Sequence, residues 1–100
     1  MSADSILDER FVVPDHVVHR SFAAETVVLN LETGGYHGLN EVGGFMLGVL
    51  AATGDPGEVV RRVVTEYGAP LDRARTDVAS FCTDLLERRL IERAKRLPGR

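Results

Sequence analysis

Three histidines and one cysteine are the side chains of this sequence best suited to acid–base, nucleophilic or metal chemistry. They are His16, His19, His37 and Cys82. His16 and His19 flank an expected strand on opposite faces, and no acidic cluster completes a metal cage around them. Cys82 lies on the apolar stripe of an expected helix, where a thiol behaves as a small hydrophobic group. The sequence therefore predicts no enzyme, no metal site and no cofactor.

The glycine-rich stretch from Gly34 to Gly38 offers main-chain chemistry instead. Phosphate-binding loops lead into a helix, whereas the pair Gly34-Gly35 leads into a short expected strand, Tyr36 to Leu39. A short strand between glycines leaves backbone N–H and C=O groups without a partner from the rest of the sequence. Such an edge can pair with the backbone of another chain.

The pattern before this strand predicts a small antiparallel sheet. Phe11 to Arg20 is apolar and extended but broken by Pro14, which indicates one irregular or edge strand. Glu25 to Leu31 alternates, with Val27, Leu29 and Leu31 on one face and Thr26, Val28 and Asn30 on the other. Residues 32–35 form a hairpin turn, after which Tyr36 is expected opposite Leu31.

After Leu39 the apolar period changes from two to about 3.6, which predicts three helices. The first is capped by Asn40 and ends near Gly54, with an apolar face of Val42, Phe45, Met46, Val49 and Leu50. The second begins at Asp55-Pro56 and ends at Gly68, with Val59, Val60, Val63, Val64 and Tyr67 on its stripe. Asp72 is expected to cap the third, whose buried side is Ala74, Val78, Phe81, Cys82, Leu85 and Leu86, and Leu90-Ile91 closes the core. Gly43 and Gly44 indicate either close backbone packing or a loosened first turn.

Composition limits the classes of protein that the chain can belong to. It has 100 residues, 44% of them hydrophobic and 27% charged, which suits one small core. The net charge of −3 excludes a molecule-wide positive field, so neither nucleic acid nor membrane is an expected partner. One cysteine allows no internal disulfide, and the polar N-terminus is not signal-like, so a cytoplasmic location and a monomer, with a dimer as the alternative, are expected.

Several short motifs together resemble those of a known family. They are the pattern Val28-Leu29-Asn30-Leu31-x-x-Gly34-x-Tyr36-x-Gly38-Leu39-Asn40, the helix boundaries Asp55-Pro56 and Glu66-Tyr67-Gly68, and Asp77-Val78-x-x-Phe81-x-x-x-Leu85. The order of elements is of the winged-helix type. Residues 11 to 91 are similar to the PqqD-like family, and most similar within it to the stand-alone recognition proteins of lasso-peptide biosynthesis. The resemblance implies an α+β, winged-helix-like fold in which a three-stranded antiparallel sheet precedes three helices (βββααα).

The resemblance also implies a function, that of a RiPP recognition element. Such a domain binds the leader segment of a ribosomally made precursor peptide as an added strand, without catalysing a reaction. Its partners are then the leader peptide, which commonly carries a Tyr-x-x-Pro element, a cysteine-type leader peptidase and a lasso cyclase. Carried onto this sequence, the strand is Tyr36 to Leu39 and the helical wall is Arg75 to Arg88. The residues expected to contact the peptide are Leu31, Tyr36, His37, Gly38, Leu39, Ala74, Asp77, Val78, Phe81, Asp84, Leu85 and Arg88.

The third helix supports this site without the family. Asp77, Phe81, Asp84 and Arg88 recur at intervals of four, three and four, and so border the core stripe with one aromatic ring and both signs of charge. The alternative is that Phe81 and Leu85 serve the core alone and that the charged residues are merely solvated. Tyr36 is open between cross-strand packing and the cleft.

Two other functions remain open. A winged-helix DNA-binding or regulatory protein has a similar element order, but the third helix carries Asp77, Asp84 and Glu87 among its arginines. A PqqD-like chaperone for a radical enzyme is the other alternative. On every interpretation residues 1–10 are expected to be a flexible N-terminus, residues 11–91 the recognition domain and residues 92–100 a flexible basic tail.

Overall fold

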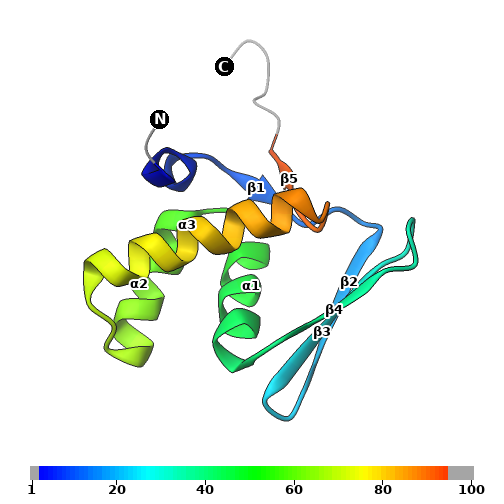
Figure 1. Ribbon diagram of the computed structural model, residues 1–100, viewed down its shortest axis with the longest axis horizontal. Coiled ribbons are helices and arrows are strands. Elements are labelled where there is room, and N and C mark those ends of the chain that lie inside the picture. Colours follow the sequence, from blue (N-terminus) through cyan, green and yellow to red (C-terminus); the bar gives the residue numbers. More distant parts are fainter. Residues whose placement is uncertain (1–2, 95–100) are drawn as a thin grey trace.

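Figure 1 shows the computed structural model of the chain, which describes residues 3–94. A small sheet projects to one side of a group of three helices. The elements in chain order are η1 (Ala3–Asp8, a 3-10 helix), β1 (Phe11–Val12), β2 (Val17–Phe22), β3 (Glu25–Asn30), β4 (Tyr36–Leu39), α1 (Glu41–Thr53), α2 (Pro56–Tyr67), α3 (Leu71–Glu87) and β5 (Glu92–Arg93). The predicted fold class is confirmed, because a three-stranded antiparallel sheet precedes three helices.

The three-stranded sheet is antiparallel with the order β2-β3-β4. Side chains along β3 alternate between a buried and a more exposed face. The buried face consists of Thr26, Val28 and Asn30. The strand ends at Asn30, one residue earlier than predicted, and Leu31 is exposed. Tyr36 therefore lies opposite Leu29, and its predicted position opposite Leu31 is wrong.

Asn30 ends the strand early because its side chain organises the turn that follows. Its Oδ1 accepts the backbone N–H of Glu32 at 2.9 Å and that of Thr33 at 3.2 Å. Its backbone C=O accepts the N–H of Gly34 at 2.8 Å, and Gly34 has the positive φ of 78° that glycine adopts without a steric cost. Local hydrogen bonds of this kind compete with the strand ladder, so the chain turns at residue 31.

Helices α1 and α2 begin and end where the sequence predicts. The side-chain oxygens of Asn40 and Asp55 each accept a backbone N–H of the following first turn, at 2.8 and 2.9 Å. Gly54 and Gly68 end the two helices in the left-handed region, with φ of 67° and 66°. The capping residues therefore predicted the boundaries of these two helices correctly.

Helix α3 begins at Leu71, two residues earlier than the predicted cap implies. Its N-cap is Pro70, with φ −60° and ψ 144°, and the C=O of Pro70 accepts the N–H of Ala74 at 2.9 Å. Asp72, the predicted cap, lies inside the first turn. The prediction of Asp72 as the cap is wrong because proline, whose φ is already fixed, can take the cap position without a side-chain hydrogen bond.

The core lies where the three helices, η1 and the inner face of the sheet meet. Its largest fully buried side chains are Phe11, Leu47, Leu50, Leu85, Leu90, Ile91, Val28, Val59, Val78, Pro56 and Cys82. Leu90 and Ile91 close the core as predicted. On α1 the buried face is turned from the predicted one, because Leu47 is buried whereas Val42 is 36% exposed and Phe45 is only half-buried.

Short elements lie in both segments that the sequence expects to be flexible. Residues 1–10 were expected to be flexible, but η1 buries Ile6 and Leu7 against the core. The expected basic tail begins with β5, which pairs antiparallel with β1 through Phe11↔Arg93 and Val12↔Glu92. The single strand expected from Phe11 to Arg20 is accordingly two strands in two sheets. The remaining tail residues, 95–100, lie outside the described residues.

Gly44 sits where α1 packs directly on β3. A Cβ atom at Gly44 would lie 2.2 Å from Oγ1 of Thr26 and 3.0 Å from its Cβ, so only glycine fits without movement. Thr26 is 4% exposed, and its Oγ1 lies 3.0 Å from the hydroxyl of Ser21 on β2. Of the two explanations left open for the glycine pair, close backbone packing is therefore confirmed for Gly44.

Candidate functional site

The outer edge of β4 carries unpaired backbone groups. The hydrogen bond from the N–H of Asn30 to the C=O of Gly35, 2.9 Å long, fixes which pairs of the β3–β4 ladder are bonded. Alternation by two residues then makes Val28–His37 and Thr26–Leu39 the next bonded pairs. The N–H and C=O groups of Tyr36 and Gly38 consequently point away from β3. Within residues 3–94 no strand pairs with this edge.

The same register decides which side chains of β4 face the helices. His37 is the cross-strand partner of the buried Val28, so the His37 side chain lies on the inner face, as does that of Leu39. Both are half-buried. Tyr36 and Gly38 lie on the outer face, and Tyr36 is 71% exposed. The side chain of His37, and not that of Tyr36, therefore faces the helices.

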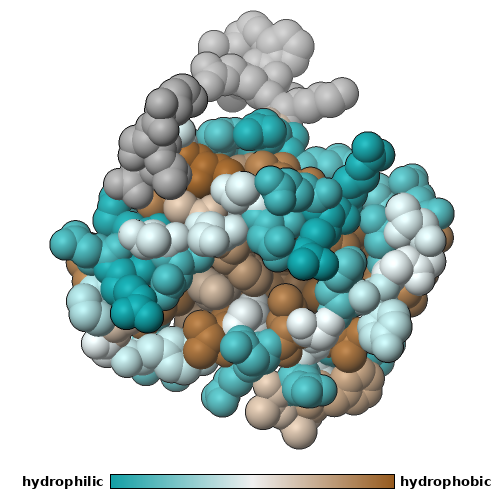
Figure 2. All heavy atoms as spheres, in the orientation of Figure 1, coloured by the Kyte–Doolittle hydropathy of each residue, from teal (hydrophilic) through white to brown (hydrophobic). Residues whose placement is uncertain are grey.

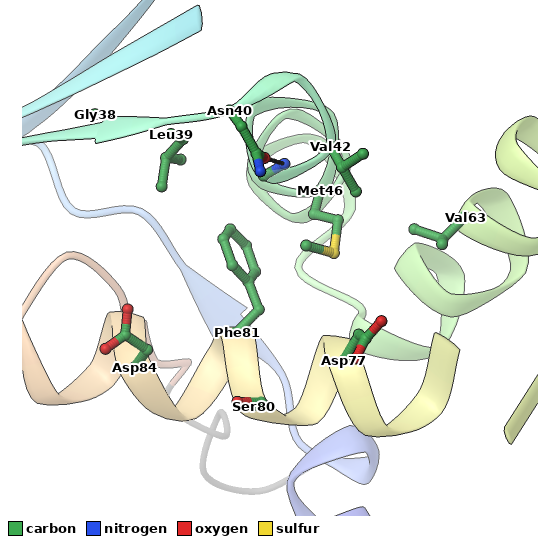
Figure 3. A pocket seen from close by; sticks show the side chains of 11 residues that line it. Gly38, Leu39, Asn40, Val42, Met46, Val63, Asp77, Ser80, Phe81 and Asp84 are labelled. Atoms are coloured by element: carbon green, nitrogen blue, oxygen red, sulfur yellow. Dashed lines mark hydrogen bonds between the residues drawn. The ribbon is translucent and has the colours of Figure 1, made fainter. Parts of the chain in front are cut away.

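An open pocket of about 560 Å³ lies between the end of β4, the start of α1 and the middle of α3. Its lining consists of Gly38, Leu39, Asn40, Val42, Gly43, Met46, Val63, Asp77, Ser80, Phe81 and Asp84. Figure 3 shows the side chains of Leu39, Met46 and Phe81 pointing toward one another across the cavity. Figure 2 shows hydrophobic side chains reaching the surface on this face, below the hydrophilic side chains of α3. The pocket has an apolar floor and room for at least one large side chain.

The charged residues of the pocket lie on its α3 rim. Asp77 pairs with Arg73 at 3.6 Å, and Asp84 pairs with Arg88 at 3.1 Å. Arg88 also reaches β4, because its Nη1 lies 3.1 Å from Nδ1 of His37. A guanidinium group can only donate, so Nδ1 of His37 accepts this hydrogen bond. The chain Asp84–Arg88–His37 thus links α3 to β4 at one end of the pocket.

The structure brings together seven of the twelve residues that the sequence singled out for peptide binding. Gly38, Leu39, Asp77, Phe81 and Asp84 line the pocket, and His37 and Arg88 form the link beside it. Phe81 is half-buried, so it serves both the core and the pocket.

The other five residues lie elsewhere. Ala74 and Val78 are 0% exposed and Leu85 is 1% exposed, so these three residues of α3 belong to the core and reach no surface. Tyr36 lies on the outer face of the sheet, and Leu31 follows β3 in the turn, 59% exposed. The burial of Ala74, Val78 and Leu85 gives no support to direct peptide contact by these three residues, whereas Asp77, Phe81 and Asp84 line the pocket beside β4.

Sequence reasoning missed the contribution of the other helices to the lining. Asn40 is the N-cap of α1, Val42, Gly43 and Met46 come from the first turns of that helix, and Val63 comes from α2. A signal for α1 was present, because this helix follows β4 after a single residue and its first turn must therefore flank the end of the strand. No local pattern indicates Val63, which reaches the pocket only through the packing of α2.

Nucleophilic chemistry has little support at this site. Burial, with a smaller contribution from Glu9, raises the pKa of the Cys82 thiol to about 12. The thiol is also fully buried, so it is protonated and out of reach of a substrate. Residues 3–94 contain no group of three or more His, Cys, Asp or Glu side chains that could hold a metal ion. The arrangement is suited to binding an extended chain by its backbone and one or more side chains.

One protein-family model matches more than half of the chain. The model described as coenzyme PQQ synthesis protein D (PqqD) matches residues 25–91, from β3 to the end of the core. The chain belongs to the PqqD family. No curated protein sequence matches this PqqD-family chain significantly. In the described part of the chain, no helix has the length and apolar character needed to cross a membrane.

Two solved structures are similar to this PqqD-family chain. One is TbiB1 in complex with the TbiA(beta) leader peptide, which is 30% identical, has a TM-score of 0.77 and covers 84% of this chain and 98% of its own. The other is lasso peptide synthetase B1 complexed with the leader peptide, which is 22% identical, has a TM-score of 0.75 and covers 83% of this chain and 98% of its own. The second likeness shows the fold alone. Both neighbours are described as complexes with a leader peptide.

Proposed function

We propose that this chain is a non-catalytic adaptor of lasso-peptide biosynthesis that binds the leader segment of a precursor peptide by adding it as a strand to β4. The observation that carries the proposal is the open edge, where the backbone groups of Tyr36 and Gly38 point outward beside the pocket. An extended peptide that pairs there gains main-chain hydrogen bonds, and the neighbouring pocket selects its side chains. The leader-peptide complexes of the two neighbours support the same class of ligand.

The pocket provides an anchor for one apolar side chain of the leader. A leader residue opposite His37 points to the inner face of the sheet, toward Leu39 and Phe81. A cavity of about 560 Å³ accommodates a large side chain such as tyrosine or leucine. This agrees with the Tyr-x-x-Pro element that the family resemblance implies.

The proposed role is that of an adaptor, because the chain would bind the leader peptide without catalysing a reaction on it. With a protonated, buried thiol and no metal group within the described residues, the chain holds the leader while another protein acts on it. A cysteine-type leader peptidase, followed by a lasso cyclase, is the partner that the family resemblance implies. We therefore expect the purified chain to leave a precursor peptide uncleaved and to act only by raising the rate of leader-dependent processing.

The test is a pair of proline substitutions on β4, measured by fluorescence anisotropy with a labelled leader peptide of a lasso precursor. Gly38→Pro removes an N–H that points outward and leaves the β3 ladder intact, so it should keep the fold and lower leader affinity at least tenfold. His37→Pro removes an N–H that pairs with β3, so it should lower the melting temperature. His37→Ala is the control that keeps both ladders.

The proposal fails if Gly38→Pro, folded as judged by its melting curve, binds the leader as tightly as the parent chain does. Unaided cleavage of the precursor by the purified chain would contradict the non-catalytic part of the proposal.

A further inference from the structure

A row of apolar side chains crosses the outer face of the three-stranded sheet and ends at the open edge. Val18, Leu29 and Tyr36 are successive cross-strand partners, so their side chains lie side by side on this face. Leu29 is half-buried, whereas Val18 is 42% exposed and Tyr36 is 71% exposed. The ring of Tyr36 has Leu29 as its neighbour on one side, and among residues 3–94 no further strand supplies a neighbour on the other.

Gly38 lies on the same face, two residues along β4 from Tyr36. Its φ is not positive, unlike that of Gly34, so its backbone conformation does not require glycine. A Cβ atom built on Gly38 meets no atom within 4 Å, so packing within the described chain does not require glycine either. The missing side chain leaves bare backbone and open space beside the Tyr36 ring.

We infer that Tyr36 and Gly38 form a second leader subsite, on the outer face of the sheet, that takes one large apolar or aromatic side chain. The inference rests on the proposed strand addition. In an added antiparallel strand, the residue opposite Tyr36 forms a hydrogen-bonded pair with it and points its side chain to the outer face. That side chain extends the row begun by Val18 and Leu29, and through the diagonal contact it covers Gly38.

The chemistry of the row sets the class of side chain. A leader side chain that joins this row next to Tyr36 contacts the ring of Tyr36 and the backbone of Gly38. Two charged residues of the strands lie on this face, Arg20 and Glu25. Arg20 is separated from Gly38 by Val27, with which both form the neighbouring row. Glu25 lies in the row beyond that, so neither charged residue lies beside the position next to Tyr36. An apolar or aromatic leader side chain gains contact there, whereas a charged one loses water without gaining a partner. The leader is then recognised on both faces of the sheet, by the pocket and by this outer subsite.

The test uses random peptides selected by display against the full chain. Only selected peptides whose binding is lost with Gly38→Pro are kept, since these depend on the β4 edge. Their affinities are then measured for the parent chain and for Tyr36→Ser, Tyr36→Phe and Gly38→Val. All three variants should keep the parent melting temperature closely, because Tyr36 is exposed and the space over Gly38 is open.

The inference predicts a large apolar residue at one shared position of the selected peptides. Tyr36→Ser should weaken their binding about five- to tenfold, and Tyr36→Phe should restore it, as expected for one cross-strand contact plus buried ring area. Gly38→Val should weaken peptides with the large residue and spare derivatives with alanine at that position. If the edge-dependent peptides bind the Tyr36→Ser and Gly38→Val variants with the same affinity as the parent chain, the inference is wrong and the proposed function still stands. Absence of any edge-dependent peptide would overturn both.

Discussion

At the scale of single residues, Asn30 connects the hairpin to the helical wall of the site. It is 2% exposed, its Oδ1 holds two N–H groups of the turn, and its Nδ2 donates to the C=O of Arg89 at 3.3 Å. Arg89 follows α3 and has the positive φ of 61°. One buried amide therefore fixes both the turn before β4 and the end of the helix that carries Arg88. This explains structurally why asparagine stands in the strand motif that pointed to the family.

The contribution of this amide can be measured by Asn30→Ala. The substitution removes three hydrogen bonds, two of them to turn N–H groups that water can reach, so it should lower the free energy of unfolding by about 2 kcal/mol. Urea denaturation measures this. Thr33→Ala is the matched control, because Thr33 Oγ1 accepts one exposed N–H, that of Gly35, at 3.1 Å and should contribute about 0.5 kcal/mol. Equal losses in the two variants would contradict a special role for Asn30.

At the scale of elements, two contacts set the position of β4 between the helices. The first is the direct packing of α1 on β3 at Gly44, which brings the start of α1 to the end of β4. The second is the link Asp84–Arg88–His37, which joins α3 to β4. The pocket lies between these two contacts, so its width depends on both.

The first contact predicts that Gly44→Ala destabilises the chain although alanine is the better helix former. The added Cβ would lie 2.2 Å from Thr26 Oγ1, so α1 or β3 must shift, at a cost of about 1–3 kcal/mol. Gly48→Ala, in the same helix, is the control. A Cβ atom there meets nothing within 4 Å, and the variant should gain up to about 1 kcal/mol. Thermal unfolding measures the stability of both variants. A gain in stability for Gly44→Ala would show that α1 does not pack on β3 as described.

The second contact predicts a salt-dependent effect of Arg88→Glu on leader binding. Arg88 is 48% exposed in its side chain, so the melting temperature should change little. Reversing its charge removes the link to His37 and leaves two carboxylates one turn apart beside the pocket. Leader affinity should therefore fall, and the loss should shrink as ionic strength rises, because an exposed rim charge acts through a screened field.

Arg61→Glu is the matched control for this prediction. It makes the same change of net charge on α2, where Arg61 pairs with Glu58 and does not line the pocket. An equal loss in both variants would assign the effect to the field of the whole molecule. A loss of leader affinity that is the same at every ionic strength would instead indicate damaged packing.

At the scale of the whole molecule, the parts predicted well from sequence are those with a local signal. Strand β4, the caps Asn40 and Asp55, and the glycine ends of α1 and α2 follow from residues that are neighbours in the chain. The pairing of β1 with β5 joins the two ends of the chain through two residues each, so no periodic pattern announces it. The burial of Leu47 and of the η1 side chains depends on the same long-range packing.

The pocket, too, could be predicted from the sequence only where a local pattern exists. Asp77, Phe81 and Asp84 are spaced by four and three residues, which places them on one face of a helix, and these three residues line the pocket. Which face of β4 points inward could not be predicted, because a shift of the turn by one residue exchanges the two faces. In the structure, the hydrogen bonds of the Asn30 side chain set where the turn begins and therefore which face of β4 points inward. The alternative of a DNA-binding protein gains no support, because the α3 rim of the pocket is acidic and the net charge is −3.

The central claim is that a peptide strand occupies the outward backbone groups of β4, and amide hydrogen exchange tests it most directly. Exchange of the four β4 amides is measured by NMR on the isotope-labelled full chain, alone and saturated with leader peptide. In the free chain, His37 and Leu39 should be protected by β3 while Tyr36 and Gly38 exchange quickly. Leader binding should slow exchange at Tyr36 and Gly38 at least tenfold, since their N–H groups gain partners. If both amides exchange as quickly with the leader bound as without it, strand addition at β4 is contradicted.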